Sequence, residues 1–294
     1  MRIFKQFRKL PLFYRTDTTR FFSISSFKTI PRYNKALRLL FFSISSITFG
    51  SGITLYILSN YGYYLKDIIP WNPNWDIAWN TLSTDLDSKE SKDFTKEPKR
   101  WHKILLVRHG HYKKESDDED NMVLTEKGRK QAELTGIRLA EQFGGRVNAI
   151  YHSNLIRAKE TAKIISNYFP GVKLIEDSNL AEGVPIAPDP PIVGYEPTSK
   201  EIAEDSIRIN KAFQTYFVRP NRDTDDNKVD IIVCHGNVIR YMFCKGLQFP
   251  TNGWLRLGHL NCGITSMAIS SESNVVCYGF GDAGHLSPDL QTHN

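Results

Sequence analysis

The stretch with the clearest chemical potential in this 294-residue sequence is an apolar run that ends in Arg108, His109 and Gly110. Residues 103–107 read Lys-Ile-Leu-Leu-Val, which is typical of a buried strand. A neutral imidazole can attack phosphorus while an adjacent guanidinium holds the phosphoryl oxygens. The pattern therefore predicts a phosphoryl-transfer site with a histidine nucleophile at the end of a strand.

Three further polar groups stand just beyond other predicted strands. They are Arg157 after a strand at 147–151, Glu182 after a strand at 172–175 and His235 after a strand at 229–234. Because ligands of open α/β sheets bind at the carboxyl ends of the strands, we expect all five groups to meet there. A phosphate monoester needs cations for its oxygens, a nucleophile, and a proton donor for its leaving group. This set supplies each of them, so we predict that neither a metal ion nor an organic cofactor takes part.

The elements that must position these residues alternate between strands and helices. Strands are expected at 103–109, 147–151, 172–175, 229–234, 265–269 and 275–280, and helices at 125–143, 154–169, 199–217 and 238–247. Thr125 is a typical helix N-cap, and Gly144 follows as a stop. The alternation predicts an α/β domain of three layers, in which helices cover both faces of a mainly parallel sheet.

The N-terminal part differs in charge from the rest of the chain. Through Arg38 there are ten Lys or Arg residues and one acidic residue, whereas the remainder carries 28 basic and 31 acidic residues. Residues 1–38 are typical of a mitochondrial targeting segment, although a disordered basic tail lying on anionic lipid shares most of these features. Because the main body is slightly acidic, we expect no nucleic-acid partner.

Residues 39–58 carry no charge. Twenty helical residues span about 30 Å, the thickness of a hydrocarbon core, so we expect one transmembrane helix with its membrane exit within 39–64. Its central Gly50-Ser51-Gly52 is either a packing face or a place where the helix can be unwound and cleaved. The basic leader predicts that the main body crosses the membrane and faces away from the matrix.

A tryptophan-rich stretch follows, with Trp71, Trp75 and Trp79 spaced by four residues. It fits an aromatic belt at the lipid headgroups, and it fits equally well a self-association motif that covers exposed tryptophans. Residues 80–100 are polar and typical of a flexible linker. We therefore divide the remainder into a linker at 65–100 and a catalytic domain at 101–294.

Two other chemistries match parts of the sequence less well. Cys234 and Arg240 have the spacing of cysteine-dependent tyrosine phosphatases, but Val238 and Ile239 occupy positions where that loop needs glycine and exposed N–H groups. His109 could share a metal with His111, yet no further Cys or His lies nearby. The four cysteines form no Cys-x-x-Cys pair, which favours a reduced compartment.

Four motifs together resemble the histidine phosphatase (phosphoglycerate-mutase-like) superfamily over about residues 101–285. They are Leu106-Val107-Arg108-His109-Gly110, Leu124-Thr125-x-x-Gly128-x-x-Gln131-Ala132, Ser153-x-x-x-Arg157-Ala158-x-x-Thr161 and Val233-Cys234-His235-Gly236. The resemblance implies that His109 is the nucleophile and that Glu182 is the proton donor. It also implies that Arg108, Arg157 and His235 bind the phosphoryl group.

Further motifs resemble the mitochondrial serine/threonine protein phosphatases of that superfamily. These motifs lie at 182–191, 237–241 and 247–257. Those phosphatases have a membrane helix followed by Trp-Asp-Pro-Asn-Trp-Asp, which reads Trp-Asn-Pro-Asn-Trp-Asp at 71–76 here. The resemblance implies phosphoprotein substrates, a bilayer and a homo-oligomer as partners. The residues implied in multimerisation are Trp71, Asn74, Trp75 and Asp76.

Two alternatives remain. A phosphoglycerate mutase or small-molecule phosphatase would use the same five residues, but the acidic stretch at 112–121 would repel small polyanions and favour basic phosphopeptides. A catalytically weak membrane scaffold would not need the complete set of five.

Overall fold

The computed structural model describes residues 71–76, 100–114, 122–223 and 226–293. The predicted targeting segment, the transmembrane span and most of the linker lie outside these residues. Within the described part, no helix is both long enough and apolar enough to cross a bilayer.

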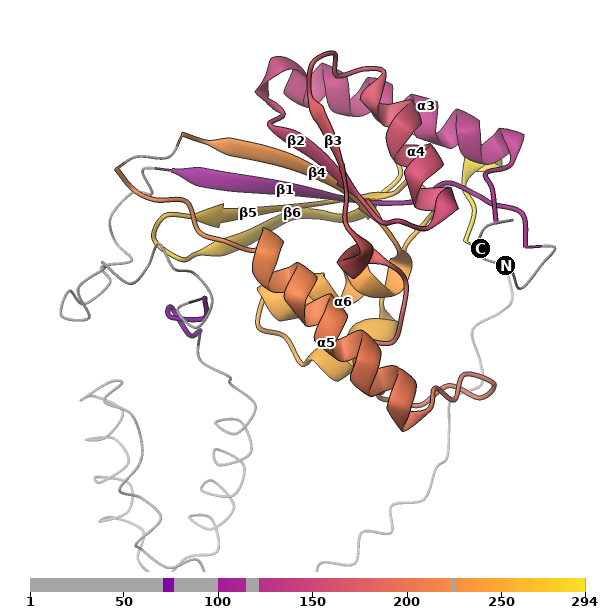
Figure 1. The fold of residues 1–294 in the computed structure, drawn as a ribbon, viewed down its shortest axis with the longest axis vertical. Helices are drawn as coiled ribbons and strands as arrows, with labels where there is room; N and C mark the ends of the chain where they lie inside the picture. The colour runs from indigo at the N-terminus through magenta and orange to yellow at the C-terminus, as the bar shows by residue number, and fades with distance from the viewer. Residues whose placement is uncertain (1–70, 77–99, 115–121, 224–225, 294) are drawn as a thin grey trace, which may run out of the picture. The chain divides into compact units, whose positions relative to one another are not determined.

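Six strands form one mixed sheet in the order β3-β2-β4-β1-β5-β6 (Figure 1). Their bounds are β1 Trp101–Arg108, β2 Ala149–His152, β3 Lys173–Glu176, β4 Lys228–Cys234, β5 Ile264–Ser270 and β6 Val275–Asp282. The first four strands of this order pair in parallel, whereas β5 is antiparallel to both β1 and β6. The prediction of a mainly parallel sheet is therefore confirmed only in part. The short turn between β5 and β6 leaves no room for a crossover, so those two strands must pair antiparallel.

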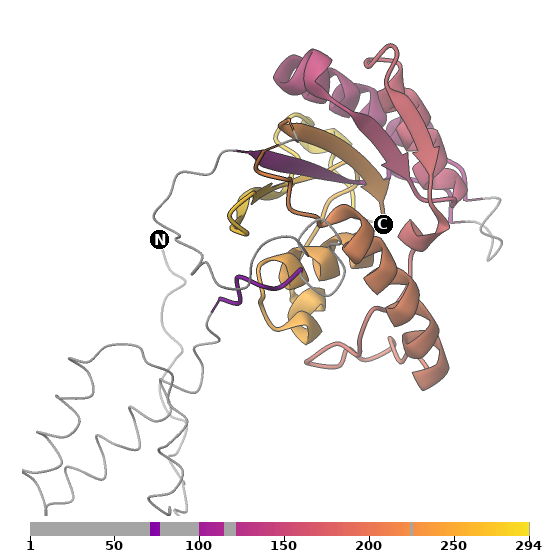
Figure 2. The same ribbon diagram turned by 60° about the vertical axis from the view of Figure 1, so that its left-hand side comes forward.

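Helices cover both faces of the sheet, as predicted. α3 (Glu126–Phe143) and α4 (Ile156–Ser166) lie on one side, and α5 (Ser199–Tyr216) and α6 (Gly236–Gly246) lie on the other (Figures 1 and 2). Thr125 caps α3 by accepting a hydrogen bond from the Gly128 N–H at 3.1 Å. The cap satisfies one of the amide groups that the helix start leaves without a partner.

The apolar run of β1 is continuous because it serves two cores. Ile104 and Leu106 pack with the α5 and α6 side, and Leu105 and Val107 pack with the α3 and α4 side. All four are fully buried. Successive side chains of a strand point to opposite faces, so a strand that is covered on both faces must be apolar throughout.

The parallel strands bring the predicted site together. Arg108 pairs with Cys234, and His152 pairs with Val233, so β1, β2 and β4 end at one level. His109, Ser153 and His235 follow directly and share that edge of the sheet.

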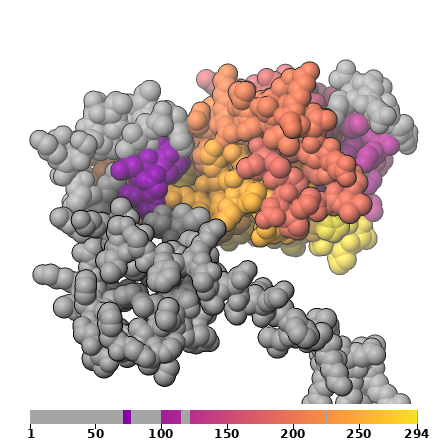
Figure 3. Space-filling model, turned by 90° about the horizontal axis from the view of Figure 1, so that it is seen from below, coloured from indigo at the N-terminus to yellow at the C-terminus, as the bar shows by residue number. Residues whose placement is uncertain are grey.

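Residues 71–76 form a turn that packs on this α/β domain, as the purple atoms in Figure 3 show. The Trp75 indole Nε1 donates to the Ser273 carbonyl at 2.9 Å, and its ring centroid lies 6.4 Å from that of Phe213. Asp76 is fully buried and accepts from both Nε (2.7 Å) and Nη2 of Arg219. Of the predicted multimerisation residues, Trp75 and Asp76 thus contact the domain, whereas Asn74 is exposed.

We expect Asp76→Ala to lower the free energy of unfolding by about 3–5 kcal/mol, because it leaves the buried Arg219 guanidinium without its carboxylate. Urea unfolding of the full chain in detergent micelles, followed by tryptophan fluorescence, measures this change. Glu176→Ala is the control, since it removes the half-exposed pair with Lys159 and should leave stability nearly unchanged. If Asp76→Ala changed the free energy of unfolding as little as Glu176→Ala, the Asp76 contact would contribute nothing to stability.

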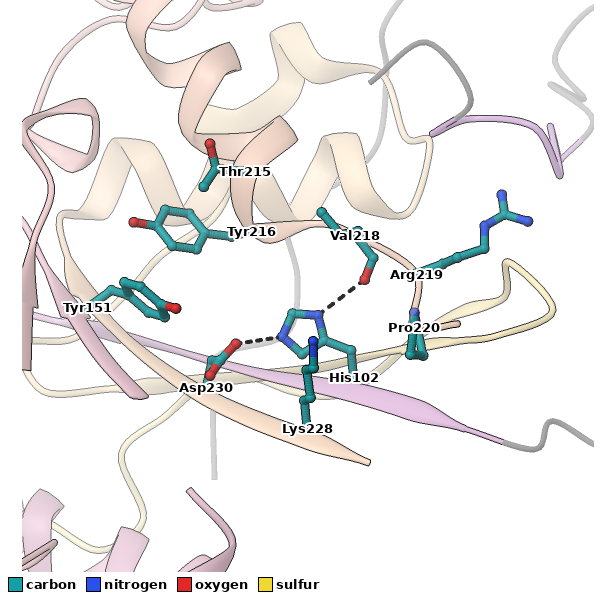
Figure 4. A pocket seen from close by; sticks show the side chains of 9 residues that line it. All are labelled: His102, Tyr151, Thr215, Tyr216, Val218, Arg219, Pro220, Lys228 and Asp230. Atoms are coloured by element: carbon teal, nitrogen blue, oxygen red, sulfur yellow. Dashed lines mark hydrogen bonds and ion pairs between the residues drawn. The ribbon is translucent and has the colours of Figure 1, made fainter. Parts of the chain in front are cut away.

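A cavity of about 250 Å³ opens near the starts of β1 and β4, at the opposite end of the strands from the predicted site (Figure 4). His102 lies in its wall, with Nε2 2.8 Å from the Asp230 carboxylate and Nδ1 3.2 Å from the Val218 carbonyl. None of the five predicted site residues lines this cavity, so it is separate from the site described next.

Candidate active site

His109 follows the last residue of β1 and is held with its ring in one tautomer. Its backbone N–H donates to the Cys234 carbonyl at 2.9 Å, which ties it to the end of β4. Ring Nδ1 lies 2.9 Å from the Gly110 carbonyl. A carbonyl oxygen can only accept, so Nδ1 carries the proton and Nε2 keeps its lone pair when the ring is neutral.

The surroundings of His109 keep the ring neutral. The residue is only 3% exposed, and burial lowers the pKa of its imidazole well below the usual value. The positive charges of Arg108 and Arg157 lower that pKa further. His109 therefore has the free electron pair that a nucleophile needs at neutral pH.

His235 follows β4 and lies beside His109, with the two ring centroids 5.1 Å apart. Its Nε2 is 2.8 Å from the Ser153 hydroxyl, and that hydroxyl also accepts from the Leu155 N–H at 3.2 Å. When the Ser153 hydroxyl donates its proton to Nε2, the ring proton of His235 lies on Nδ1. Nδ1 is buried and has no partner among the described residues, so it is available to donate to a phosphoryl oxygen.

Two buried arginines complete the predicted phosphate-binding set. Arg108 Nη1 donates to the His259 carbonyl at 2.5 Å, and the Arg157 guanidinium lies 5.1 Å from the centre of the Tyr112 ring. Burial lowers the pKa of Arg108, while the nearby Glu182 carboxylate raises it. Burying a cation is costly unless an anion compensates it, and a phosphoryl group supplies that charge.

Glu182 follows the short 3₁₀ turn at Ser178–Leu180 and is partly buried. Burial raises the pKa of its carboxyl group, against the Gly183 N–H at 3.1 Å and the charges of Arg108 and Arg157. A raised pKa favours the protonated form, which is what a proton donor requires. All five predicted residues therefore lie in one site.

The structure adds residues to which the sequence assigned no role there. Ser153 orients His235, as described above, and Arg240 brings a third guanidinium to the site. A Cβ built on Gly236 would lie 3.5 Å from Arg108 Nε and 3.8 Å from Arg240 Cζ, so both guanidinium groups flank this glycine. The i+4 spacing from Gly236 on a helix was the signal in the sequence for Arg240.

The competing cysteine chemistry does not fit this geometry. Cys234 is fully buried, and burial raises the pKa of its thiol, whereas a cysteine nucleophile must be a thiolate. His111 Nδ1 lies 2.8 Å from the Thr125 hydroxyl. No cluster of three or more His, Cys, Asp or Glu residues suited to a metal occurs within the described residues.

Comparison with known proteins identifies the family of this chain. Residues 104–184 match the histidine phosphatase superfamily, branch 1. The chain is 39% identical over 233 residues to the human mitochondrial serine/threonine-protein phosphatase PGAM5, across 76% of this chain and 80% of that protein. The chain belongs to the PGAM5 family of the histidine phosphatase superfamily.

Other relatives show the same likeness. The mitochondrial PGAM5 phosphatase of Drosophila erecta is 37% identical over 234 residues, which are 76% of this chain and 81% of that protein. A solved structure described as a Plasmodium falciparum phosphoglycerate mutase is 40% identical, covering 62% of this chain and 91% of that chain with a TM-score of 0.46. Membership of the PGAM5 family makes this chain an enzyme of the histidine phosphatase superfamily. The matched superfamily segment includes His109, Arg157 and Glu182, whereas His235 lies beyond it and joins them only in the folded domain.

Proposed function

We propose that this PGAM5-family enzyme hydrolyses phosphoserine and phosphothreonine in proteins through a phosphohistidine at His109. The observation that carries the proposal is the Nδ1 contact to the Gly110 carbonyl in a buried, cationic setting, which leaves Nε2 as a neutral nucleophile. The human and fly relatives are named as serine/threonine protein phosphatases, which supports the substrate class.

In the first step, the Nε2 lone pair of His109 forms a bond to phosphorus while the bond from phosphorus to the substrate side-chain oxygen breaks. Glu182 gives its proton to that oxygen, so that an alcohol leaves instead of an alkoxide. Arg108, Arg157 and the Nδ1–H of His235 bind the phosphoryl oxygens and stabilise the charge that they carry in the transition state.

In the second step, the Glu182 carboxylate takes a proton from water, and the resulting hydroxide attacks phosphorus. The bond between phosphorus and His109 Nε2 breaks, and inorganic phosphate leaves. Glu182 is then protonated again, and His109 is neutral, so the site has returned to its starting state.

We further propose that the enzyme is a single-pass protein of a mitochondrial membrane, with its catalytic domain outside the matrix. The names of the relatives support the mitochondrial location, and the uncharged run at 39–58 supports the membrane helix. We propose that copies assemble through residues 71–76. The tryptophan-rich sequence of this segment supports the assembly, and the burial of Asp76 against Arg219 holds the segment on its own domain.

The substrate class is tested by comparing phosphopeptides with 3-phosphoglycerate on the full chain in detergent micelles, with release of inorganic phosphate as the readout. We expect kcat/KM for phosphoserine and phosphothreonine peptides to exceed that for 3-phosphoglycerate by at least about 10-fold. This ratio corresponds to a difference of about 1.4 kcal/mol or more in transition-state binding. The His109→Ala variant reports the background. Faster turnover of 3-phosphoglycerate, or its conversion to another phosphoglycerate, would overturn the proposed substrate class.

A further inference from the structure

We propose that an ion pair on α5, Asp205 with Arg208, positions the proton donor Glu182. Both are positioning residues that act on the leaving-group step through the backbone of the segment at 179–184. This inference rests on the role of Glu182 in the proposed function and extends it to side chains outside the phosphate site.

Arg208 binds the backbone at Glu182 and just before it. Its Nη1 donates to the carbonyls of Ala181 at 2.6 Å and Asn179 at 3.3 Å, and its Nη2 donates to the carbonyl of Glu182 at 3.0 Å. One guanidinium therefore satisfies three main-chain acceptors within four residues. The planar, forked arrangement of its N–H groups makes this possible, and a lysine ammonium could not reproduce it.

Asp205 binds the backbone just after Glu182. One carboxylate oxygen accepts from Arg208 Nη2 at 2.5 Å, and the other accepts from the Val184 N–H at 2.8 Å. A Cβ built on Gly183 would lie 2.4 Å from the Asp205 carboxylate, so only glycine leaves room for this approach. We call Asp205 and Arg208 the clamp, because together they bind the main chain on both sides of the proton donor.

A second helix, α6, binds the same segment. The Asn237 side-chain amide donates to the Gly183 carbonyl at 3.1 Å, and its oxygen accepts from Arg240 Nη1 at 3.3 Å. The segment lies in the long connection between β3 and α5, where the 3₁₀ turn at Ser178–Leu180 is the one helical element. Main-chain groups in such a connection need partners from elsewhere, and here the helices supply them.

The contacts of the pair favour a positioning role, because they converge on the main chain on both sides of the proton donor. Its side chains are only 23% and 24% exposed, so water competes little with these hydrogen bonds. A proton donor must stay within hydrogen-bond reach of the leaving oxygen, and a displacement of about 1 Å can cost about 10²-fold in rate. Rigid support for Glu182 therefore has a large kinetic effect.

The test measures kcat/KM, which reports formation of the phosphoenzyme and not its later hydrolysis, on two substrates that differ in their need for a proton. A phosphoserine peptide releases a poor leaving group, whereas p-nitrophenyl phosphate releases a stable phenolate. In the full chain, Arg208→Ala should lower kcat/KM for the peptide about 10–100-fold and kcat/KM for p-nitrophenyl phosphate less than about threefold. Because the acid is already missing in Glu182→Ala, adding Arg208→Ala to that variant should lower peptide turnover by less than a further factor of about three.

Two further variants separate positioning from charge and from general damage. Arg208→Lys keeps the positive charge but loses the forked donors, so it should show the same selective loss on the peptide. Lys130→Ala removes an exposed i,i+3 pair with Glu133 on α3 and should leave both substrates unaffected. It matches the i,i+3 spacing of the α5 pair.

The outcomes distinguish the clamp from the role of Glu182 itself. Suppose that Glu182→Ala lowers kcat/KM selectively for the peptide, but Arg208→Ala and Arg208→Lys lower it equally for both substrates. The positioning proposal is then overturned, and the acid role stands. If Glu182→Ala also lowers kcat/KM equally for both substrates, the acid role fails, and the clamp proposal fails with it. Wild-type rates in both Arg208 variants would likewise overturn the clamp.

Discussion

His109→Ala should abolish turnover of phosphopeptides and formation of a phosphoenzyme together, with a loss in kcat of at least about 10⁴-fold. The reason is that the alanine variant has no atom at the position of Nε2 that can accept the phosphoryl group. Arg108, Arg157 and His235 would remain and could still bind phosphate, so substrate binding should persist while chemistry stops. Rapid acid-free quenching with labelled substrate measures the phosphoenzyme, and release of inorganic phosphate measures turnover.

His111→Ala is the matched control for this experiment. His111 lies two residues further along and contacts Thr125 instead of His109 or His235. We expect it to keep the phosphoenzyme and most of the activity. A labelled, acid-labile phosphoenzyme that persists in His109→Ala would contradict the assignment of the nucleophile, as would turnover close to that of the wild type.

Glu182→Ala should lower kcat/KM for phosphoserine peptides by about 10²–10⁴-fold, the usual contribution of a general acid. This parameter reports formation of the phosphoenzyme and leaves out the later step in which Glu182 activates water. The loss should be smallest with p-nitrophenyl phosphate, because p-nitrophenolate leaves without first taking a proton. Steady-state rates with substrates of graded leaving-group basicity measure this dependence. An equal loss with every leaving group would contradict the acid role.

The pH dependence follows from the directions of two pKa shifts. Burial raises the pKa of Glu182, and the first step needs its protonated form, so kcat/KM should fall as pH rises through that pKa. Burial and two arginines lower the pKa of His109, and the step needs its neutral form, so the acid limb should lie well below pH 6.5. Glu182→Gln should remove the alkaline limb and leave the acid limb in place. An alkaline limb that is unchanged in this variant would assign it to another group.

Much of the fold could be predicted because local patterns determine it. The unbroken apolar run of β1 indicates a strand covered on both faces, and Thr125 marks the start of α3. Strands that run parallel end at one edge, so residues just beyond them could be assigned to one site without coordinates. The direction of β5 was missed because periodicity identifies a strand but not the partner beside it.

The sequence by itself therefore determined the positions of the helices and strands and the five residues that meet at the carboxyl edge of the sheet. Only the tertiary structure decided which side chains hold those residues in place. Asp205 reaches Val184 across 21 residues, Ser153 reaches His235 across 82, and Asp76 reaches Arg219 across 143. Such contacts leave no periodic trace, because a hydrogen bond depends on where two separate elements pack and not on the neighbours of either residue along the chain.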